Sequence, residues 1–413
     1  MVTEEEKNSI VAPSLTRKGV LGLIGNTPLV PIRRLNPNPN VLVLAKYEAV
    51  NPGGSIKARI ALRMIEAAEE SGELTPGKTI LEATSGNTGI GLALVATVKG
   101  YPIVLAMSEA VSLERRKILA ALGAEFLLTA PDRGTDGAIE MAYQQVRDEP
   151  DKYFLPDQFN NPANIDAHYL GTGMEIWRDT KGLVTHFVAS MGTTGTLMGC
   201  SKRLKEMNDQ VQIIGVEPYL GHKIQGLKNL KEAYVPGIYC REAIDELVNV
   251  DDDAAFEMAR RLSKEEGLFV GMSSGAAMHV AIEKAKQLDE GVVVTILPDG
   301  GERYLSTNLF MVSEEEQVEP VESALHLINT FSRRKERFST RQEGEAVLYT
   351  CGPTLNRRPH LGLYRRVVLA DILRRYLEYE YDYSVKHVVG LVDMDENVLN
   401  TAKQENKSPE EIS

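Results

Sequence analysis

Short apolar runs alternate with longer amphipathic segments over the first three quarters of the chain. The run at 41–45 predicts a buried strand, and the segment 55–70 predicts a helix because apolar residues recur every fourth position from Ile56 to Ala68. Such alternation is typical of βαβ units, so it predicts an α/β fold. The same pattern predicts further strands at 79–83, 102–107, 184–190, 211–216 and 292–297, and further helices at 89–99, 113–122, 252–266 and 275–288.

A change of composition after residue 312 predicts a domain boundary. Residues 313–322 are acidic, contain a proline and have little apolar content, as exposed linkers do. We therefore expect a first domain at 1–312, a linker at 313–326 and a separate segment at 327–413. A chain of 413 residues is also longer than a domain with one hydrophobic core usually is, which favours two or three domains.

Composition and charge are those of a soluble globular protein. The chain is 43% hydrophobic and 25% charged, and its three cysteines are far apart, which argues against a disulfide framework. No apolar run approaches the roughly 18 residues of a membrane-spanning helix, and the acidic N-terminus does not resemble a signal peptide. A net charge of −12 does not favour a nucleic-acid partner. We therefore expect a cytoplasmic enzyme that acts on small molecules, without a metal site.

Two glycine-rich segments carry the candidate chemistry. Residues 51–59 place Lys57 at the start of a helix after two glycines, which allow close approach to the backbone. Residues 84–89 form a turn that leads into a helix, where unpaired N–H groups favour an anion. A lysine that can form a Schiff base, beside an anion site, is the minimum for pyridoxal phosphate chemistry on an amino acid. Each segment alone is also consistent with an ordinary helix start.

Six motifs in order resemble those of the cysteine synthases (O-acetylserine sulfhydrylases), which are fold type II enzymes that use pyridoxal 5'-phosphate. The resemblance extends from residue 24 to about residue 309. It implies two α/β subdomains, this cofactor and a homodimer. The motifs lie at 51–59, 84–89, 112–117, 158–164, 271–277 and 297–304.

The resemblance also implies a role for individual residues. Lys57 would hold the cofactor as a Schiff base and then act as a general base. Ser273 would face the pyridine nitrogen and Asn87 the phenolic oxygen. The turn at 192–196 would bind the phosphate, with Thr194 where the family pattern has glycine. The implied substrate-binding residues are Thr84, Ser85, Asn87, Thr88, Gln158 and Lys228, and the implied cofactor-binding residues are Lys57, Asn87, Gly192, Thr193, Thr194, Gly195, Thr196 and Ser273.

The implied reaction is β-replacement on an O-activated L-serine, either O-acetylserine or O-phosphoserine. The leaving group departs to give α-aminoacrylate, and a sulfur nucleophile adds to give L-cysteine. Lys228 stands where relatives that use O-phosphoserine carry arginine, so it would contact a phosphate leaving group; the alternative is a solvated lysine. His168 matches a polar position near the substrate, with a structural histidine as the alternative. Ala58 replaces the usual aspartate after the lysine.

Two other functions stay open at this point. One is a different β-replacement on the same fold, of the cystathionine β-synthase or diaminopropionate synthase type. The other is a non-catalytic regulatory protein on this scaffold, although the presence of Lys57 argues against it.

The segment from about residue 327 resembles the N-terminal part of cysteinyl-tRNA synthetase, a class I enzyme. Matching residues at 348–354 and 359–362 imply a strand followed by a helix that begins near His360, which is half of a nucleotide-binding fold. The second ATP loop of that family and three of its four zinc ligands are absent, so Cys351 is interpreted as a core cysteine. We expect a truncated segment that does not aminoacylate and serves in docking or regulation.

Overall fold

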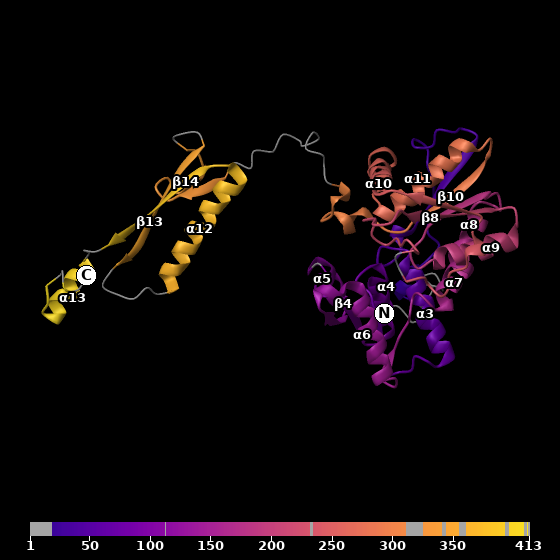
Figure 1. The fold of residues 1–413 in the computed structure, drawn as a ribbon, viewed down its shortest axis with the longest axis horizontal. Helices are drawn as coiled ribbons and strands as arrows, with labels where there is room; N and C mark the ends of the chain where they lie inside the picture. The colour runs from indigo at the N-terminus through magenta and orange to yellow at the C-terminus, as the bar shows by residue number, and fades with distance from the viewer. Residues whose placement is uncertain are drawn as a thin grey trace, which may run out of the picture. The chain divides into compact units, whose positions relative to one another are not determined.

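The computed structural model describes residues 19–111, 113–231, 234–310, 325–340, 344–354, 361–392, 396–408 and 411. The chain divides into two compact units, unit 1 at residues 1–311 and unit 2 at residues 312–413 (Figure 1). Most of the predicted linker lies outside the described residues. None of the described helices is long and apolar enough to cross a membrane.

A six-stranded sheet forms the larger half of unit 1. Its order is β1-β2-β10-β7-β8-β9, in which β1 runs antiparallel to β2 and all other neighbours are parallel. Runs of valine, isoleucine and leucine fit its central strands, because helices cover both faces of such sheets. The strands are β1 (Leu29–Pro31), β2 (Val41–Tyr47), β7 (His186–Ser190), β8 (Gln212–Pro218), β9 (Glu246–Val250) and β10 (Gly291–Leu297).

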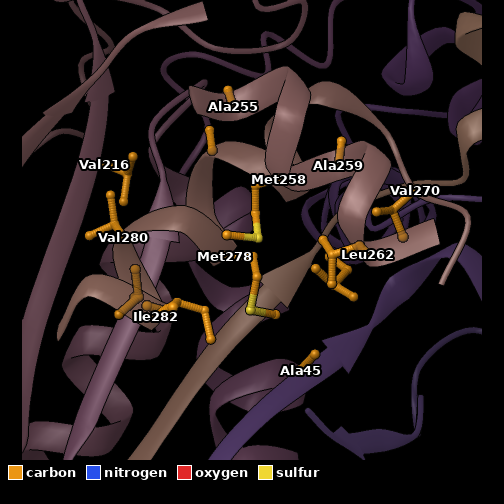
Figure 2. Close-up of a cluster of buried hydrophobic side chains, with 14 of the residues drawn as sticks. Ala45, Val216, Ala255, Met258, Ala259, Leu262, Val270, Met278, Val280 and Ile282 are labelled. Carbon is orange, nitrogen blue, oxygen red and sulfur yellow. The ribbon is translucent and has the colours of Figure 1, made fainter. Parts of the chain in front are cut away.

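Helices cover both faces of this sheet. Figure 2 shows one face, where Met258 of α10 and Met278 of α11 belong to a buried cluster that also contains Ala45 and Val216 of the sheet. On the other face, α8 and α9 pack against residues such as Phe187. The sheet is therefore the middle layer of three. These helices are α8 (Gly173–Asp179), α9 (Gly195–Met207), α10 (Asp252–Glu266) and α11 (Met272–Gln287).

A four-stranded parallel sheet in the order β5-β4-β3-β6 forms the smaller half of unit 1. Helices α3 and α4 pack on one face around Ile60 and Leu92, and α6 packs on the other through Ala138 and Ala142. The elements are β3 (Thr79–Ala83), β4 (Ile103–Ser108), β5 (Glu125–Thr129), β6 (Tyr153–Phe154), α3 (Lys57–Ser71), α4 (Asn87–Lys99), α5 (Leu113–Ala121), α6 (Gly134–Asp148), α7 (Pro162–Ala167) and a π-helical turn, η4 (His168–Thr172).

The strands and helices predicted in unit 1 are confirmed, with differences only at their ends. Strand β3 and helix α10 match residue for residue. The apolar face of α3 is buried, and Gly72 ends the helix with φ 78°, a conformation that favours glycine. The sequence analysis did not predict β1, β5, β6, β9, α6, α7 and α8. The four strands have two to five residues, and α7 and α8 have six and seven, which is too short for a clear period. Helix α6 has Gly134 and Gly137 in its first turn, which have low helix propensity.

Unit 2 contains a strand–helix–strand arrangement in which β13 and β14 are parallel neighbours. The predicted strand around Cys351 and the helix after it are confirmed as β13 and α12. The interpretation of Cys351 as a core cysteine is wrong, because its thiol is exposed. His360 lies outside the described residues. The elements are β11 (His326–Asn329), β12 (Arg334–Arg337), β13 (Glu345–Thr354), α12 (Leu361–Tyr381), β14 (Ser384–Val392) and α13 (Glu396–Glu405).

Candidate active site

Most of the predicted site residues line one cavity of about 270 Å³ in unit 1. The cavity receives residues that directly follow strand β3 of the four-stranded sheet and strands β7 and β10 of the six-stranded sheet. The carboxyl ends of such strands are the usual ligand sites of open α/β folds, because helices begin there with unpaired N–H groups. The predicted residues that line the cavity are Lys57, Thr84, Asn87, Thr88, Gln158, Gly192, Thr193, Thr194, Thr196, Lys228 and Ser273.

Two predicted residues lie beside this cavity. Ser85 lines an adjoining cavity of about 500 Å³, which shares Gly86 and Asn87 with the first. Gly195 is the first residue of α9, and a Cβ there would lie 1.9 Å from Oδ1 of Asn164. Gly195 is therefore needed for the shape of the turn rather than as a lining residue.

Lys57 is held at the cavity by the end of strand β10. The backbone N–H of Ile56 donates to the carbonyl of Pro298 at 2.8 Å, and Ser55 forms an isolated bridge with Asp299. Burial lowers the pKa of the Lys57 amine, while the charge of Asp299 opposes that shift. A larger share of neutral amine is what a nucleophile or base requires at this position.

The two glycines before Lys57 accommodate an arginine. Gly53 and Gly54 have φ 81° and 69°, and a Cβ on Gly54 would lie 2.5 Å from Nη2 of Arg303. The Arg303 guanidinium also donates to the carbonyl of Gly53. The sequence predicts that another group approaches the backbone closely at these glycines. In the structure the side chain of Arg303 makes part of this approach.

Asn87 is fixed from two sides. Its Nδ2 donates to Oδ2 of Asp299 at 2.6 Å, and its Oδ1 accepts a hydrogen bond from Arg303. Tyr304 donates its hydroxyl to the same Asp299 oxygen at 2.7 Å. Burial raises the pKa of Asp299, and the Tyr304 and Asn87 hydrogen bonds oppose this rise. These contacts orient the Asn87 amide at the edge of the cavity.

Sequence reasoning missed Asp299, Arg303 and Tyr304 as site residues, although all three belong to the motif at 297–304. The available signal was the position of that motif directly after strand β10, where side chains reach the cavity.

Gln158 connects the turn at 84–89 to the turn at 192–196. Its Oε1 accepts a hydrogen bond from the hydroxyl of Thr88 at 2.7 Å, and its carbonyl accepts one from Nδ2 of Asn164 at 2.7 Å. The same Asn164 nitrogen lies 3.1 Å from Oγ1 of Thr193. The two turns are therefore held at a defined spacing.

The turn at 192–196 joins strand β7 to helix α9. Thr194 has φ 67° and is 3% exposed, and its hydroxyl has no hydrogen-bond partner among the described residues. A Cβ on Gly192 would lie 2.5 Å from the carbonyl of Gly226. A buried hydroxyl beside the first N–H groups of a helix has the donors that a phosphate would accept from.

His168 supports this turn from behind. Its Nε2 lies 3.2 Å from the hydroxyl of Thr196, and its Nδ1 lies 3.0 Å from the hydroxyl of Thr172. Burial, followed by the charges of Arg59 and Lys57, holds the pKa of His168 well below its usual range. The histidine is therefore neutral and contacts the site through Thr196, which agrees with the structural alternative.

Ser273 and Lys228 complete the wall of the cavity. Ser273 lies in the first turn of α11 and is 6% exposed. Lys228 places its Nζ 4.3 Å from the centroid of the Phe159 ring, and partial burial lowers its pKa. A cation that is held over an aromatic ring at a cavity wall is less hydrated than a surface lysine.

Comparison with known proteins identifies the family of unit 1. The model of the family described as "Pyridoxal-phosphate dependent enzyme" matches residues 20–299. The chain belongs to this family. Cysteine synthase from Aquifex aeolicus is 48% identical over 302 residues, which cover 71% of this chain and 92% of the relative. Cysteine synthase B from Pseudomonas aeruginosa is 45% identical over 287 residues, which cover 70% of this chain and 95% of the relative.

Solved structures support the same grouping. The crystal structure of O-acetylserine sulfhydrylase isoform 3 from Entamoeba histolytica matches with a TM-score of 0.68 and 39% identity, over 72% of this chain and 92% of that one. Unit 1 is therefore a pyridoxal-phosphate dependent enzyme domain of the cysteine synthase type. For unit 2, the model described as "tRNA synthetases class I (C) catalytic domain" matches residues 337–413.

The residues present fit the cofactor of this family. Lys57 supplies an amine with a lowered pKa, and the turn at 192–196 supplies a buried hydroxyl and helix N–H groups for the phosphate. The cavity between them also contains the hydroxyl of Ser273. Lys57 would hold the cofactor through its aldehyde carbon.

Proposed function

We propose that unit 1 catalyses β-replacement on an O-activated L-serine with a sulfur nucleophile and gives L-cysteine. The observation that supports this most directly is the placement of Lys57. Its amine lies in the cavity wall with a lowered pKa, and the turns at 84–89 and 192–196 lie around the same cavity. An amine and two anion sites on one cavity match an amino acid beside a phosphorylated cofactor.

The proposed chemistry divides between the cofactor and Lys57. Bound pyridoxal phosphate supplies the electron sink for the electron pair that remains when the α-proton of the amino acid is removed. Lys57 accepts that proton, since burial keeps a share of its amine neutral at a pH where a surface lysine is charged. Its place at the start of α3 fixes the amine at the cavity wall.

We assign substrate binding to the turn at 84–89. Thr84, Ser85, Asn87 and Thr88 surround the N-terminus of α4, where N–H groups and the helix dipole attract the α-carboxylate. Gln158 would contact the substrate beside this turn, since its Oε1 is held by the hydroxyl of Thr88 and it lines the same cavity. The contacts of Asp299 and Arg303 with Asn87 keep this turn in one arrangement.

We assign cofactor binding to Lys57, Asn87, Ser273 and the turn at 192–196. The turn would receive the phosphate, with the hydroxyl of Thr194 as one of its donors. A serine hydroxyl cannot protonate a pyridine nitrogen as a carboxylic acid would. Ser273 therefore favours elimination from the β-carbon over reactions that need a longer-lived carbanion.

Lys228 distinguishes the two candidate leaving groups. Its partly dehydrated cation at the cavity wall would bind a phosphate more strongly than an acetate. We expect Lys228→Ala to lower kcat/KM for O-phosphoserine by about tenfold or more and to leave O-acetylserine turnover unchanged. The control is Lys228→Arg, which keeps the charge. An equal loss with both substrates would assign Lys228 a structural role instead.

Product analysis tests the function itself. The full-length protein with pyridoxal phosphate is supplied with O-acetylserine or O-phosphoserine and, in turn, sulfide, homocysteine or an amine. We expect L-cysteine from sulfide to exceed the other products. Cystathionine or diaminopropionate as the main product would support the alternative β-replacements, and no product from any nucleophile would support the regulatory scaffold.

For the whole chain we propose a homodimeric, cytoplasmic fusion of an enzyme domain at 1–312, a linker at 313–326 and a synthetase-like segment at 327–413. We propose that this segment resembles the first part of cysteinyl-tRNA synthetase and acts in docking or regulation. We expect no ATP–pyrophosphate exchange with cysteine. Clear exchange that persists in Lys57→Ala would overturn this part without affecting the proposal for unit 1.

A further inference from the structure

Helix α12 of unit 2 has an apolar stripe that faces solvent. Tyr364, Val368, Ile372, Tyr376 and Tyr379 follow one another at intervals of four or three residues, so they lie on one side of the helix. Their exposed fractions are 57%, 56%, 57%, 41% and 84%. Soluble proteins rarely leave a continuous apolar surface of this kind uncovered, so the stripe points to an interaction.

The packing of unit 2 uses the opposite side of α12. Among the side chains of α12 that the structure describes, Ala370 and Leu377 are buried, and α12 lies beside β13 and β14 (Figure 1). Ala370 is about 160° from Ile372 around the helix axis at 100° per residue. The stripe therefore lies on the side of α12 away from these buried residues. Of its members, Tyr376 also packs edge-on against Tyr381 of the same helix, with ring centroids 5.7 Å apart.

We propose that this stripe is an interface between two copies of the chain, whose α12 helices pair antiparallel across a two-fold axis at Ile372. In this register Ile372 of one copy meets Ile372 of the other, and Val368 of each copy packs against Tyr376 of the other. A two-fold interface requires a surface that is complementary to itself, and the stripe has that property.

Two charged residues near the ends of α12 favour the antiparallel arrangement. Arg365 lies near the first end, about 20° from Ile372 around the helix axis and so within the range of the stripe. Glu380 lies near the last end, about 80° from Ile372 on the same side, and both residues are exposed. They are seven and eight residues from Ile372, so antiparallel pairing places Arg365 of each copy beside Glu380 of the other. Parallel pairing would place the two Arg365 side chains together. Apolar burial would provide most of the stability, and the exposed ion pairs would select the direction.

Cysteine cross-linking in the full-length protein tests this register. Cys240 and Cys351 are first replaced by serine, because their thiols are exposed. Ile372→Cys then places one thiol from each copy at the axis, where helices about 8–10 Å apart bring the two Cβ atoms within reach of a disulfide. The matched control is Tyr379→Cys, whose two thiols would be about 21 Å apart along the helices.

We expect mild oxidation to convert Ile372→Cys into a covalent dimer at least about tenfold faster than Tyr379→Cys. Equal rates for the two variants would indicate parallel or random contact and would overturn the proposal. No cross-link in Ile372→Cys would also overturn it, whether another part of the chain or a different partner covers the stripe.

A second pair of variants leaves the stripe intact. Arg365→Cys and Glu380→Cys should cross-link when the two proteins are mixed and not when each is oxidised alone. A mixture that gives no more cross-link than the separate proteins contradicts the register, even if Ile372→Cys fails to fold. Both tests are independent of the enzymatic activity of unit 1.

Discussion

Unit 1 buries ionised side chains, whereas unit 2 exposes apolar ones. In unit 1 the Arg59 guanidinium is 5% exposed and lies 2.7 Å from carboxylate oxygens of both Glu48 and Glu175. In unit 2 Phe331 and Tyr379 are 98% and 84% exposed. The number of layers explains this contrast. Helices cover both faces of each sheet in unit 1, whereas the described part of unit 2 has two sheets of two strands each.

The ion pairs of the two units differ in the same way. The bond between Arg59 and Glu175 joins residues 116 apart and ties α3 to α8, whereas the described ion pairs of α12 join residues three or four apart. Long-range pairs in a closed interior hold separate elements in one arrangement, while local pairs support only their own helix. The candidate active-site cavity lies in unit 1, whose elements such long-range pairs hold in place.

The largest expected effect concerns the cavity of unit 1. We expect Lys57→Ala to lower kcat/KM for cysteine formation by about 10³-fold or more, because Lys228, the other lysine that lines the cavity, holds its amine over the Phe159 ring rather than at the start of α3. Lys386→Ala in unit 2 is the control and should leave the rate unchanged. The assay measures L-cysteine from O-acetylserine and sulfide with saturating pyridoxal phosphate. Substantial turnover by Lys57→Ala would remove the basis for placing the activity in this cavity.

The next prediction tests the buried ion pairs. Arg59→Ala leaves the buried Glu48 without the cation that it pairs with and leaves Glu175 only its ion pair with Lys46, so it should cost about 3–5 kcal/mol of unfolding free energy. Urea unfolding followed by the fluorescence of Trp177, the single tryptophan of the chain, reports on unit 1 alone.

The control for this experiment is an exposed ion pair of the same unit. Arg133 pairs with Glu140, and both side chains are more than half exposed. We expect Arg133→Ala to change the free energy by less than about 1 kcal/mol. Equal losses in the two variants would mean that burial does not set the strength of these pairs.

A third prediction concerns a buried acid on β3. Glu82 is 4% exposed, and burial followed by the charge of Asp157 raises its pKa to about 8, while backbone N–H groups of Ala83, Gln158 and Asp157 oppose this shift. The folded state therefore binds one more proton than the unfolded state between the unfolded pKa near 4.5 and about 8. The contribution of Glu82 to the free energy of unfolding is therefore fully present below this pH window and is lost as the pH rises through it.

Glu82→Gln should remove this pH dependence. The difference in unfolding free energy between the two proteins should change by up to about 1.4 kcal/mol per pH unit across the window. Urea unfolding at several pH values, again followed by Trp177, measures it. Parallel pH profiles for the two proteins would show that Glu82 does not titrate in this range.

The smallest effect is a count of reactive thiols. Cys200 is buried in unit 1, and burial raises the pKa of its thiol, whereas Cys240 and Cys351 are exposed. A thiol reagent should modify two cysteines in the folded protein and the third only after denaturation. Cys351→Ser should remove one fast equivalent. Three fast equivalents in the folded protein would contradict the closed interior of unit 1.

Local patterns in the sequence determined most elements of unit 1 and the identity of its reactive amine. Helix α10 begins where Asp251 accepts a hydrogen bond from the N–H of Ala254, and its apolar residues recur with the period of a helix. The glycines and threonines at 192–196 indicate a strand-to-helix turn without reference to the rest of the chain. Caps, periodicity and turn residues each depend on a few neighbouring residues, so the sequence alone is enough to predict the elements that they mark.

Only the tertiary structure decided which distant groups meet. Asn87 and Asp299 are 212 residues apart, and nothing local to either residue indicates their hydrogen bond or the arginine beside Gly54. The same holds for Cys351, whose exposure depends on which side of β13 the helix α12 covers. Burial, pKa and hydrogen-bond partners depend on segments that come together only on folding, whereas periodicity and turn chemistry belong to single segments.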